Sequence, residues 1–343
     1  MGSVTMPQPS AGRPATRHTT SRLDRFLMQG GIVITFLVVA LVATALVEPR
    51  FLNRLNLINV LRNFSFLVIP SLAQMLIMTA GGFDLSVGAV VAVSSVVAAA
   101  VMLTGLAAFP GMETMVILMA LAAVIGVGVL VGLVNAGLIA TFALSPFMVT
   151  LAMMSVLTGI VLFYTQGIPI YGVADSFISN VGRGQILGLP VVFVIAMAIV
   201  VVCIIMQRFT ALGRHIYAVG SDERSARLSG VSTRRTLLIA YSFGAVLAAI
   251  TGFLMTSRLG SGQGTIGGSL ALETIAAAVI GGVSLRGGVG RAEHVALAAL
   301  FLTVIANAMN LIQVDSKYQA LVLGAVLIVA LAIERLLLSR KSA

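Results

Sequence analysis

The 343-residue chain contains no tryptophan and few charged side chains. Charged residues make up 9% of the sequence and hydrophobic residues 59%, whereas an ordinary soluble domain carries roughly 25% charged residues. The mean hydropathy is +1.10. Too few polar side chains remain to cover a soluble surface, so the composition indicates an integral membrane protein. Without tryptophan, any aromatic belt at the membrane interfaces must come from tyrosine and phenylalanine.

Sequence motifs for catalysis and metal binding are also missing. The chain has no G-x-x-x-x-G-K-[ST] phosphate-binding loop, no H-E-x-x-H pair and no G-x-S-x-G nucleophile motif. Its three histidines, His18, His215 and His294, are far apart in the sequence. The one cysteine, Cys203, lies in an apolar run and has no second cysteine to form a disulfide with. We therefore expect no enzyme activity, no metal site and no cofactor, and any ATP hydrolysis must be carried out by a separate protein.

The net charge of +10 would suggest a nucleic-acid partner in a soluble protein. Here the basic residues flank apolar runs, where Lys and Arg set the orientation of membrane helices. The excess of positive charge is therefore a topology signal, and no nucleic-acid partner is expected.

Apolar runs predict an all-α integral membrane protein with about ten transmembrane helices, some of them broken or half-length. A membrane helix needs about 20 mainly apolar residues. The candidate spans are residues 31–48, 64–81, 86–106, 114–135, 147–165, 190–206, 236–256, 272–284, 293–313 and 318–336. The eighth run is short, and the glycine-rich stretch 280–290 that follows it indicates a helix that ends inside the protein.

The distribution of basic residues predicts that both termini are cytoplasmic. This orientation places 15 of the 21 Lys and Arg residues on the inner side and the other six outside, as the positive-inside rule requires. It gives a disordered cytoplasmic tail over 1–29, a transmembrane domain over 30–337 and a short cytoplasmic tail over 338–343. Residues 50–62 are the exception, because three arginines lie outside. Their apolar residues recur at helical spacing and suggest a short interfacial helix.

The most distinctive segment is the charged stretch 207–235, which carries six arginines between two apolar runs. It has the pattern of a short helix with a cap, an acidic first turn, a basic residue at i+4 and a terminating glycine, at Ser221 or Asp222, Glu223, Arg227 and Gly230. A solvated loop would need only scattered arginines. The pattern therefore favours an exposed helix around 221–230 that binds a partner protein.

Polar side chains inside apolar runs are candidates for a translocation path, namely Asp84, Asn135, Glu273, Asn307 and Asn310. A charge at the bilayer centre costs about 2.5–3.5 kcal/mol, so Asp84 needs a reason to be there. Either it contacts a substrate or gate, or it caps the helix that follows it. The same two interpretations apply to Glu273. The asparagine amides can bind substrate hydroxyl groups or join neighbouring helices.

A short internal similarity links residues 81–88 with residues 281–288, which share the pattern G-G-x-x-L-x-x-G. Many transporters are built from two repeats with broken helices near a central site. Eight residues can also agree by chance in a chain with 35 glycines.

Taken together, these segments resemble the sugar-type permeases of bacterial ABC importers, the family of ribose, xylose, galactose and autoinducer-2 permeases. The resemblance covers residues from about 51 to 336, and its matching stretches are residues 51–60, 81–88, 146–151, 212–220, 226–231 and 275–288. Each stretch is weak evidence alone, and the set is highly specific.

The resemblance implies a permease subunit that carries a monosaccharide or related polyol across the bacterial inner membrane by alternating access, driven by ATP. It implies an ABC ATP-binding subunit, a second permease chain and an extracytoplasmic sugar-binding protein as partners, besides membrane lipid. The loop 207–235 would dock on the ATPase, through Leu212, Gly213, Arg214, Gly220, Asp222, Glu223, Ala226, Arg227 and Gly230. The alternative is an ion-coupled secondary transporter with Asp84 as the coupling acid.

Overall fold

The structure is a computed structural model that describes residues 31–315, 318–319, 321–322, 324–325 and 328. The expected N-terminal tail 1–29 and C-terminal tail 338–343 lie outside the described residues, as does most of the expected tenth span, 318–336.

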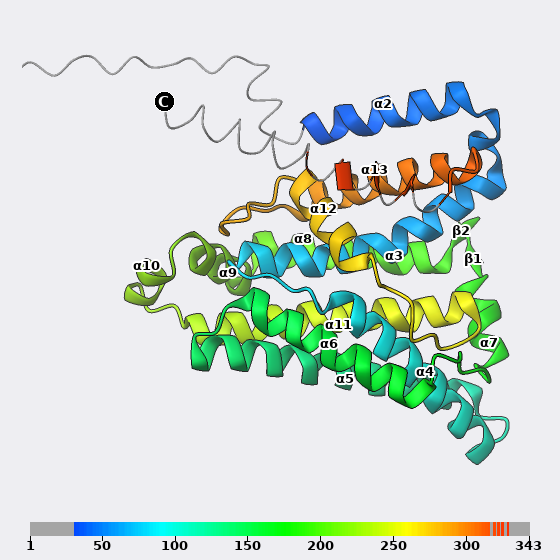
Figure 1. Cartoon of the computed structure of the whole chain (residues 1–343), viewed down its shortest axis with the longest axis horizontal. Coiled ribbons are helices and arrows are strands. Elements are labelled where there is room, and N and C mark those ends of the chain that lie inside the picture. Colours follow the sequence, from blue (N-terminus) through cyan, green and yellow to red (C-terminus); the bar gives the residue numbers. More distant parts are fainter. Residues whose placement is uncertain (1–30, 316–317, 320, 323, 326–327, 329–343) are drawn as a thin grey trace, which may run out of the picture.

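Long helices dominate the described part of the chain (Figure 1). They are α2 (Ile32–Val47), α3 (Arg54–Thr79), α4 (Val87–Ala108), α5 (Glu113–Phe142), α6 (Pro146–Thr165), α8 (Val191–Phe209), α11 (Thr233–Leu259), α12 (Leu270–Ile280) and α13 (Ala292–Leu311). These helices coincide with the first nine expected runs. Seven of them are long and apolar enough to cross a membrane, whereas α2 and α12 are shorter. An apolar run in lipid becomes helical because a helix satisfies its own backbone polar groups.

Short elements gather at the two ends of the bundle (Figure 1). One end holds α9 (Ala211–Ser221) and α10 (Glu223–Leu228). The opposite end holds α7 (Asp175–Phe177), η3 (Ile178–Gly182), β1 (Gln185–Ile186) and β2 (Leu189–Pro190), and the two strands form an antiparallel hairpin.

The expectation of a separate interfacial helix over residues 50–62 is wrong. A 3-10 turn, η2 (Pro49–Leu52), is followed by α3, which runs without interruption from Arg54 to Thr79. Asn53 caps this helix, because its side chain accepts a hydrogen bond from the backbone N–H of Leu55 at 3.0 Å. Arg62 therefore lies on a membrane helix, and its guanidinium donates to the Arg183 carbonyl at 3.0 Å.

Burial separates inner helices from outer ones. Helix α3 is buried from Phe64 to Thr79, and it packs against α11, α13, α12 and α8. Helices α5 and α6 expose large apolar side chains, such as Leu130 at 63% and Phe163 at 86%. An outer face of this kind is stable only in an apolar surrounding, which agrees with a multi-pass membrane protein.

Two connections run into the bundle from opposite ends (Figure 1). Residues 80–86 join α3 to α4, and residues 260–269 join α11 to α12. They meet where Gly88, in the first turn of α4, lies against Gly267, just before α12: a Cβ on Gly267 would lie 2.6 Å from the Gly88 carbonyl oxygen. The expectation that the eighth run is not a plain span is confirmed, because α12 has only 11 residues and residues 281–291 form turns.

Candidate functional site

The short capped helix expected around residues 221–230 is present as α10. The Asp222 carboxylate accepts a hydrogen bond from the backbone N–H of Ser225 at 2.7 Å, which satisfies a free donor of the first turn. Glu223 and Arg227 pair at 2.7 Å across one turn. Gly230 ends the segment with a φ of 82°, a conformation that glycine adopts without strain.

A second short helix, α9, precedes α10 and was not foreseen as a separate element. Thr210 caps it, because its hydroxyl accepts from the backbone N–H of Gly213 at 3.1 Å. The inward face consists of Gly213, Ile216 and Val219, all buried and three residues apart. A capping threonine followed by this spacing was the sequence signal for an amphipathic helix.

Exposure divides the expected coupling residues into two groups. Five are exposed and available to a partner, namely Arg214, Asp222, Glu223, Arg227 and Gly230. Gly213 and Ala226 are buried within the chain, and Leu212 and Gly220 are half-buried. The exposed side of α10 also carries Leu228, whose side chain is 83% exposed. The first group can meet another protein, whereas the second holds α9 and α10 against the bundle.

A cavity of about 490 Å³ opens beside these two helices. Its walls come from the end of α9, the start of α10, the connection after α3 and the facing ends of α5, α6 and α11. Arg227, Arg234 and Arg286 line it together with Asp222 and Glu223. Both signs of charge therefore lie at this end of the bundle, next to the point where residues 80–86 enter it.

The second candidate region surrounds Asp84, which is 1% exposed. Its carboxylate accepts hydrogen bonds from the backbone N–H of Ser86 at 2.7 Å and from the Ser86 hydroxyl at 2.5 Å. The Asn135 amide of α5 donates to the same hydroxyl at 3.1 Å. The structure therefore joins Asp84 to Asn135 through Ser86. Because the carboxylate lies just before α4, the positive end of the helix dipole also stabilises its charge.

Neighbouring helices fix the rest of this connection. The Thr150 hydroxyl of α6 accepts from the Leu85 backbone N–H at 3.1 Å, and the Tyr241 hydroxyl of α11 donates to the Phe83 carbonyl at 3.1 Å. Sequence reasoning did not single out Thr150 or Tyr241, because a hydroxyl in an apolar run gives no sign of its partner. The Asp84 carboxylate accepts from a backbone N–H beside the start of α4, which favours the interpretation of Asp84 as a helix cap.

The other three path candidates lie elsewhere. Glu273 accepts from the Ser269 hydroxyl at 2.6 Å at the start of α12. Asn307 is buried and exchanges two amide hydrogen bonds with Asn56 of α3, at 2.9 and 3.0 Å. Asn310, one turn further, accepts from Gln319 instead. None of the three bonds to the Asp84–Ser86–Asn135 chain in the hydrogen bonds of the described residues, so their observed roles are contacts between or within helices.

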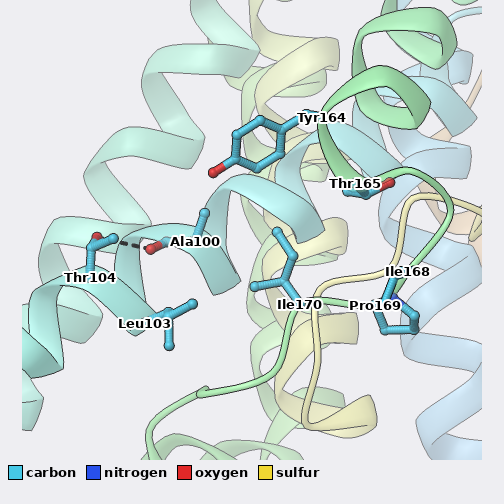
Figure 2. A pocket seen from close by; sticks show the side chains of 8 residues that line it. All are labelled: Ala100, Leu103, Thr104, Tyr164, Thr165, Ile168, Pro169 and Ile170. Carbon is cyan, nitrogen blue, oxygen red and sulfur yellow. Dashed lines mark hydrogen bonds between the residues drawn. The ribbon is translucent and has the colours of Figure 1, made fainter.

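A smaller cavity of about 280 Å³ lies towards the opposite end of the bundle (Figure 2). Its lining comes from α4, the end of α6 and the segment after α6, as Ala100, Leu103, Thr104, Tyr164, Thr165, Ile168, Pro169 and Ile170. Hydroxyl groups of tyrosine and threonine are its side-chain polar groups, in a largely apolar wall. Across residues 31–315, no group of three or more His, Cys, Asp and Glu side chains is placed to hold a metal ion.

The structure combines apolar helices, connections that run into the bundle and two short charged helices at one end. This is the architecture of a multi-pass membrane protein. The chain belongs to the family described as branched-chain amino acid transport system / permease component, whose model matches residues 56–331. The family resemblance drawn from the sequence is thereby confirmed.

Curated relatives agree over most of the chain. The ribose import permease protein RbsC of Bacillus subtilis is 35% identical, covering 87% of this chain and 90% of the relative. The galactose/methyl galactoside import permease protein MglC of Escherichia coli is 33% identical, covering 92% and 96%. The D-allose transport system permease protein AlsC of Escherichia coli is 31% identical, covering 88% and 91%. No solved structure matches the chain significantly.

These relatives are permease components of transport systems, so the chain is a transport subunit and not an enzyme. They support the importer interpretation and give no support to an ion-coupled transporter that uses Asp84.

Proposed function

We propose that this chain is the permease subunit of an ATP-driven ABC importer that carries a monosaccharide or related polyol across the bacterial inner membrane. The family and the names of the relatives support this function. The observation that carries it is the α9–α10 pair, two short capped helices with exposed charge between two membrane helices. A chain without a phosphate-binding loop needs such a surface to receive work from a separate ATPase.

In this proposal the α9–α10 end of the bundle faces the cytoplasm. That end holds Arg208, Arg214, Arg224, Arg227, Arg234, Arg235, Arg286 and Arg291, whereas the opposite end holds Arg50, Arg54, Arg62, Arg183 and Arg258. This distribution follows the positive-inside rule. The hairpin β1–β2 and its neighbours then lie outside, where a sugar-binding protein can dock.

The ATP-binding subunit would contact the exposed side of α10. Leu228 is a large apolar side chain that is 83% exposed, and Arg224 and Arg227 flank it. An apolar anchor with a charged rim is the usual composition of a protein–protein contact. Ala226 is 5% exposed, so it supports α10 from behind and does not meet the ATPase.

The translocation path would run past the two connections that enter the bundle, and a second permease chain would complete it. Residues 80–86 and 260–269 carry backbone polar groups into the bundle, a feature of transporter folds whose sites lie near the bilayer midplane. Tight substrate recognition is then left to the binding protein, because a path that binds its sugar strongly would release it slowly.

The direct test is uptake by proteoliposomes that contain the chain, its ATP-binding subunit and its binding protein. Radiolabelled ribose, galactose and allose are the probes, since these sugars appear in the names of the relatives. Uptake of at least one probe should require ATP and all three proteins. If the chain alone moves a sugar down a proton or sodium gradient without the ATPase, the proposal is overturned.

A further inference from the structure

Three glycine-containing turns meet at the end of α9. The backbone N–H of Gly288 donates to the carbonyl oxygen of Thr79 at 2.9 Å, which joins the turn after α12 to the end of α3. Gly220, in the last turn of α9, lies against both of them. Gly287 also lies against Gly81, so the two glycine-rich stretches that share a sequence pattern are in contact with each other and with α9.

Only glycine fits at Gly220. A Cβ added there would overlap the Thr79 carbonyl oxygen and lie 2.7 Å from the Gly288 nitrogen. On the facing side, a Cβ on Gly287 would lie 2.9 Å from the Cα of Gly81. All of these neighbours are backbone atoms, which cannot rotate away as a flexible side chain would. The contact therefore joins α9 directly to the backbone of both turns, with no room for a side chain between them.

A second set of contacts ties α9 to the start of α13. The Tyr217 hydroxyl donates a hydrogen bond to the Gly290 carbonyl. Burial, with a further contribution from Glu293, raises the pKa of the Tyr217 phenol, so this group keeps its proton and remains a donor. Just before α9, the Gln207 side chain accepts from the backbone N–H of Ala292 at 3.0 Å, and Arg208 pairs with Glu293.

Both turns lead to the interior of the bundle. After Thr79, at the end of α3, the chain continues through residues 80–86, which include Gly81 and Asp84, to the start of α4. Residues 281–291 connect the short helix α12 to α13. The connection before α12 in turn meets α4 at the contact of Gly267 with Gly88. One contact at the end of α9 thus holds both the start of the connection to α4 and the turn that follows α12.

We infer that Gly220 is a positioning residue for transport. Through it, a displacement of α9 moves the connection 80–86, which leads to α4, together with the turn 281–291, which follows α12. The inference rests on the proposed function, in which the ATPase displaces α9 and α10. It adds the route by which that displacement reaches the path: from Gly220 to the Thr79 carbonyl on one side and to the 287–288 turn on the other. In this inference Gly220 acts through its backbone neighbours and not by binding the ATPase or the sugar.

The test is Gly220→Ala in the complete complex with its ATPase and binding protein. The control is Gly137→Ala on α5, because a Cβ there meets nothing within 4 Å. Sugar uptake and ATP hydrolysis are measured at equal membrane abundance, with whichever of ribose, galactose or allose the wild type imports. We expect Gly220→Ala to lower the number of sugars carried per ATP hydrolysed by about tenfold. A role in folding alone would lower both rates together and leave this ratio unchanged.

Tyr217→Phe keeps the inference testable if Gly220→Ala fails to fold, because it removes one donor and adds no atom. It should lower the same ratio by about threefold, since a weaker attachment of α9 loses part of each displacement. Wild-type ratios in Tyr217→Phe and in any Gly220→Ala that assembles would overturn the inference. If the wild-type complex itself shows no ATP-dependent uptake, it is the proposed function that fails.

Discussion

Gly88 and Gly267 lie with their backbones in direct contact, although the connections that lead to them, residues 80–86 and 260–269, enter the bundle from opposite ends. A Cβ on Gly88 would overlap the Gly267 carbonyl group, and Gly267 has a φ of 83°. The close approach lets the helices α4 and α12, which both begin inside the bundle, start side by side. Neither residue could carry a side chain without separating them.

Gly88→Ala should therefore destabilise the protein, even though alanine favours a helix over glycine by about 0.5–1 kcal/mol. Overlap with a backbone carbonyl should cost roughly 1–3 kcal/mol. The measurement is thermal unfolding of the purified chain in detergent. Gly159→Ala is the control on α6, where a Cβ meets nothing within 4 Å, and it should leave the unfolding temperature unchanged or higher. Equal unfolding temperatures for the two variants would contradict the contact.

Asp84→Asn and Asp84→Ala should differ sharply. The amide oxygen of asparagine can still accept from the Ser86 backbone N–H, whereas alanine leaves a buried donor without a partner at a cost of about 1–3 kcal/mol. We expect Asp84→Asn to retain most ATP-driven uptake and Asp84→Ala to lower the unfolding temperature. A complete loss of uptake in a stable Asp84→Asn protein would instead assign the carboxylate charge a direct part in transport.

Charge reversal on the exposed side of α9 and α10 should weaken ATPase binding without unfolding the chain. Arg227 pairs with Glu223 through side chains that are 69% and 55% exposed, and such pairs contribute only about 0.2–1 kcal/mol. We expect Arg214→Glu and Arg227→Glu to reduce copurification of the ATPase and ATP-driven uptake at normal membrane abundance. Arg183→Glu, at the opposite end, is the matched control for copurification of the ATPase, which it should leave unchanged. Unchanged coupling in both variants would argue against docking here.

Asp222→Ala should loosen α10 selectively. Loss of an N-cap costs about 1 kcal/mol of helix stability, which is large for a helix of six residues. Hydrogen exchange of the backbone amides at 223–228 should become faster in Asp222→Ala and remain close to wild type in Asp222→Asn, whose side chain still caps. Identical exchange in the two variants would mean that tertiary packing, not the cap, holds α10.

Sequence patterns predicted much of this architecture because they are local. Nine apolar runs became helices close to their expected bounds, and the charged pattern around Asp222 and Gly230 became α10. The prediction failed at residues 50–62, where apolar residues at helical spacing suggested a separate interfacial helix. The η2 turn and Asn53 cap instead start α3 at Arg54, so that its first turns and the membrane run form one helix.

Pairing between distant segments was beyond the sequence. Asn307 and Asn310 are one turn apart on the same helix, yet one pairs with Asn56 of α3 and the other with Gln319. Spacing along a helix defines a face, but the partner of that face depends on which helix packs there.

By itself, the sequence determined that this chain is a helical membrane protein with a charged, capped segment, because hydrophobicity, charge and capping act over a few residues. Its two similar glycine-rich stretches could be noticed but not interpreted. Only the tertiary structure decided that Gly81, Gly220 and Gly287 pack together, and that Gly88 meets Gly267. The sequence shows that these residues are glycines, but not why a side chain would not fit there. The reason is a backbone atom that lies too close, and here that atom belongs to a distant part of the chain.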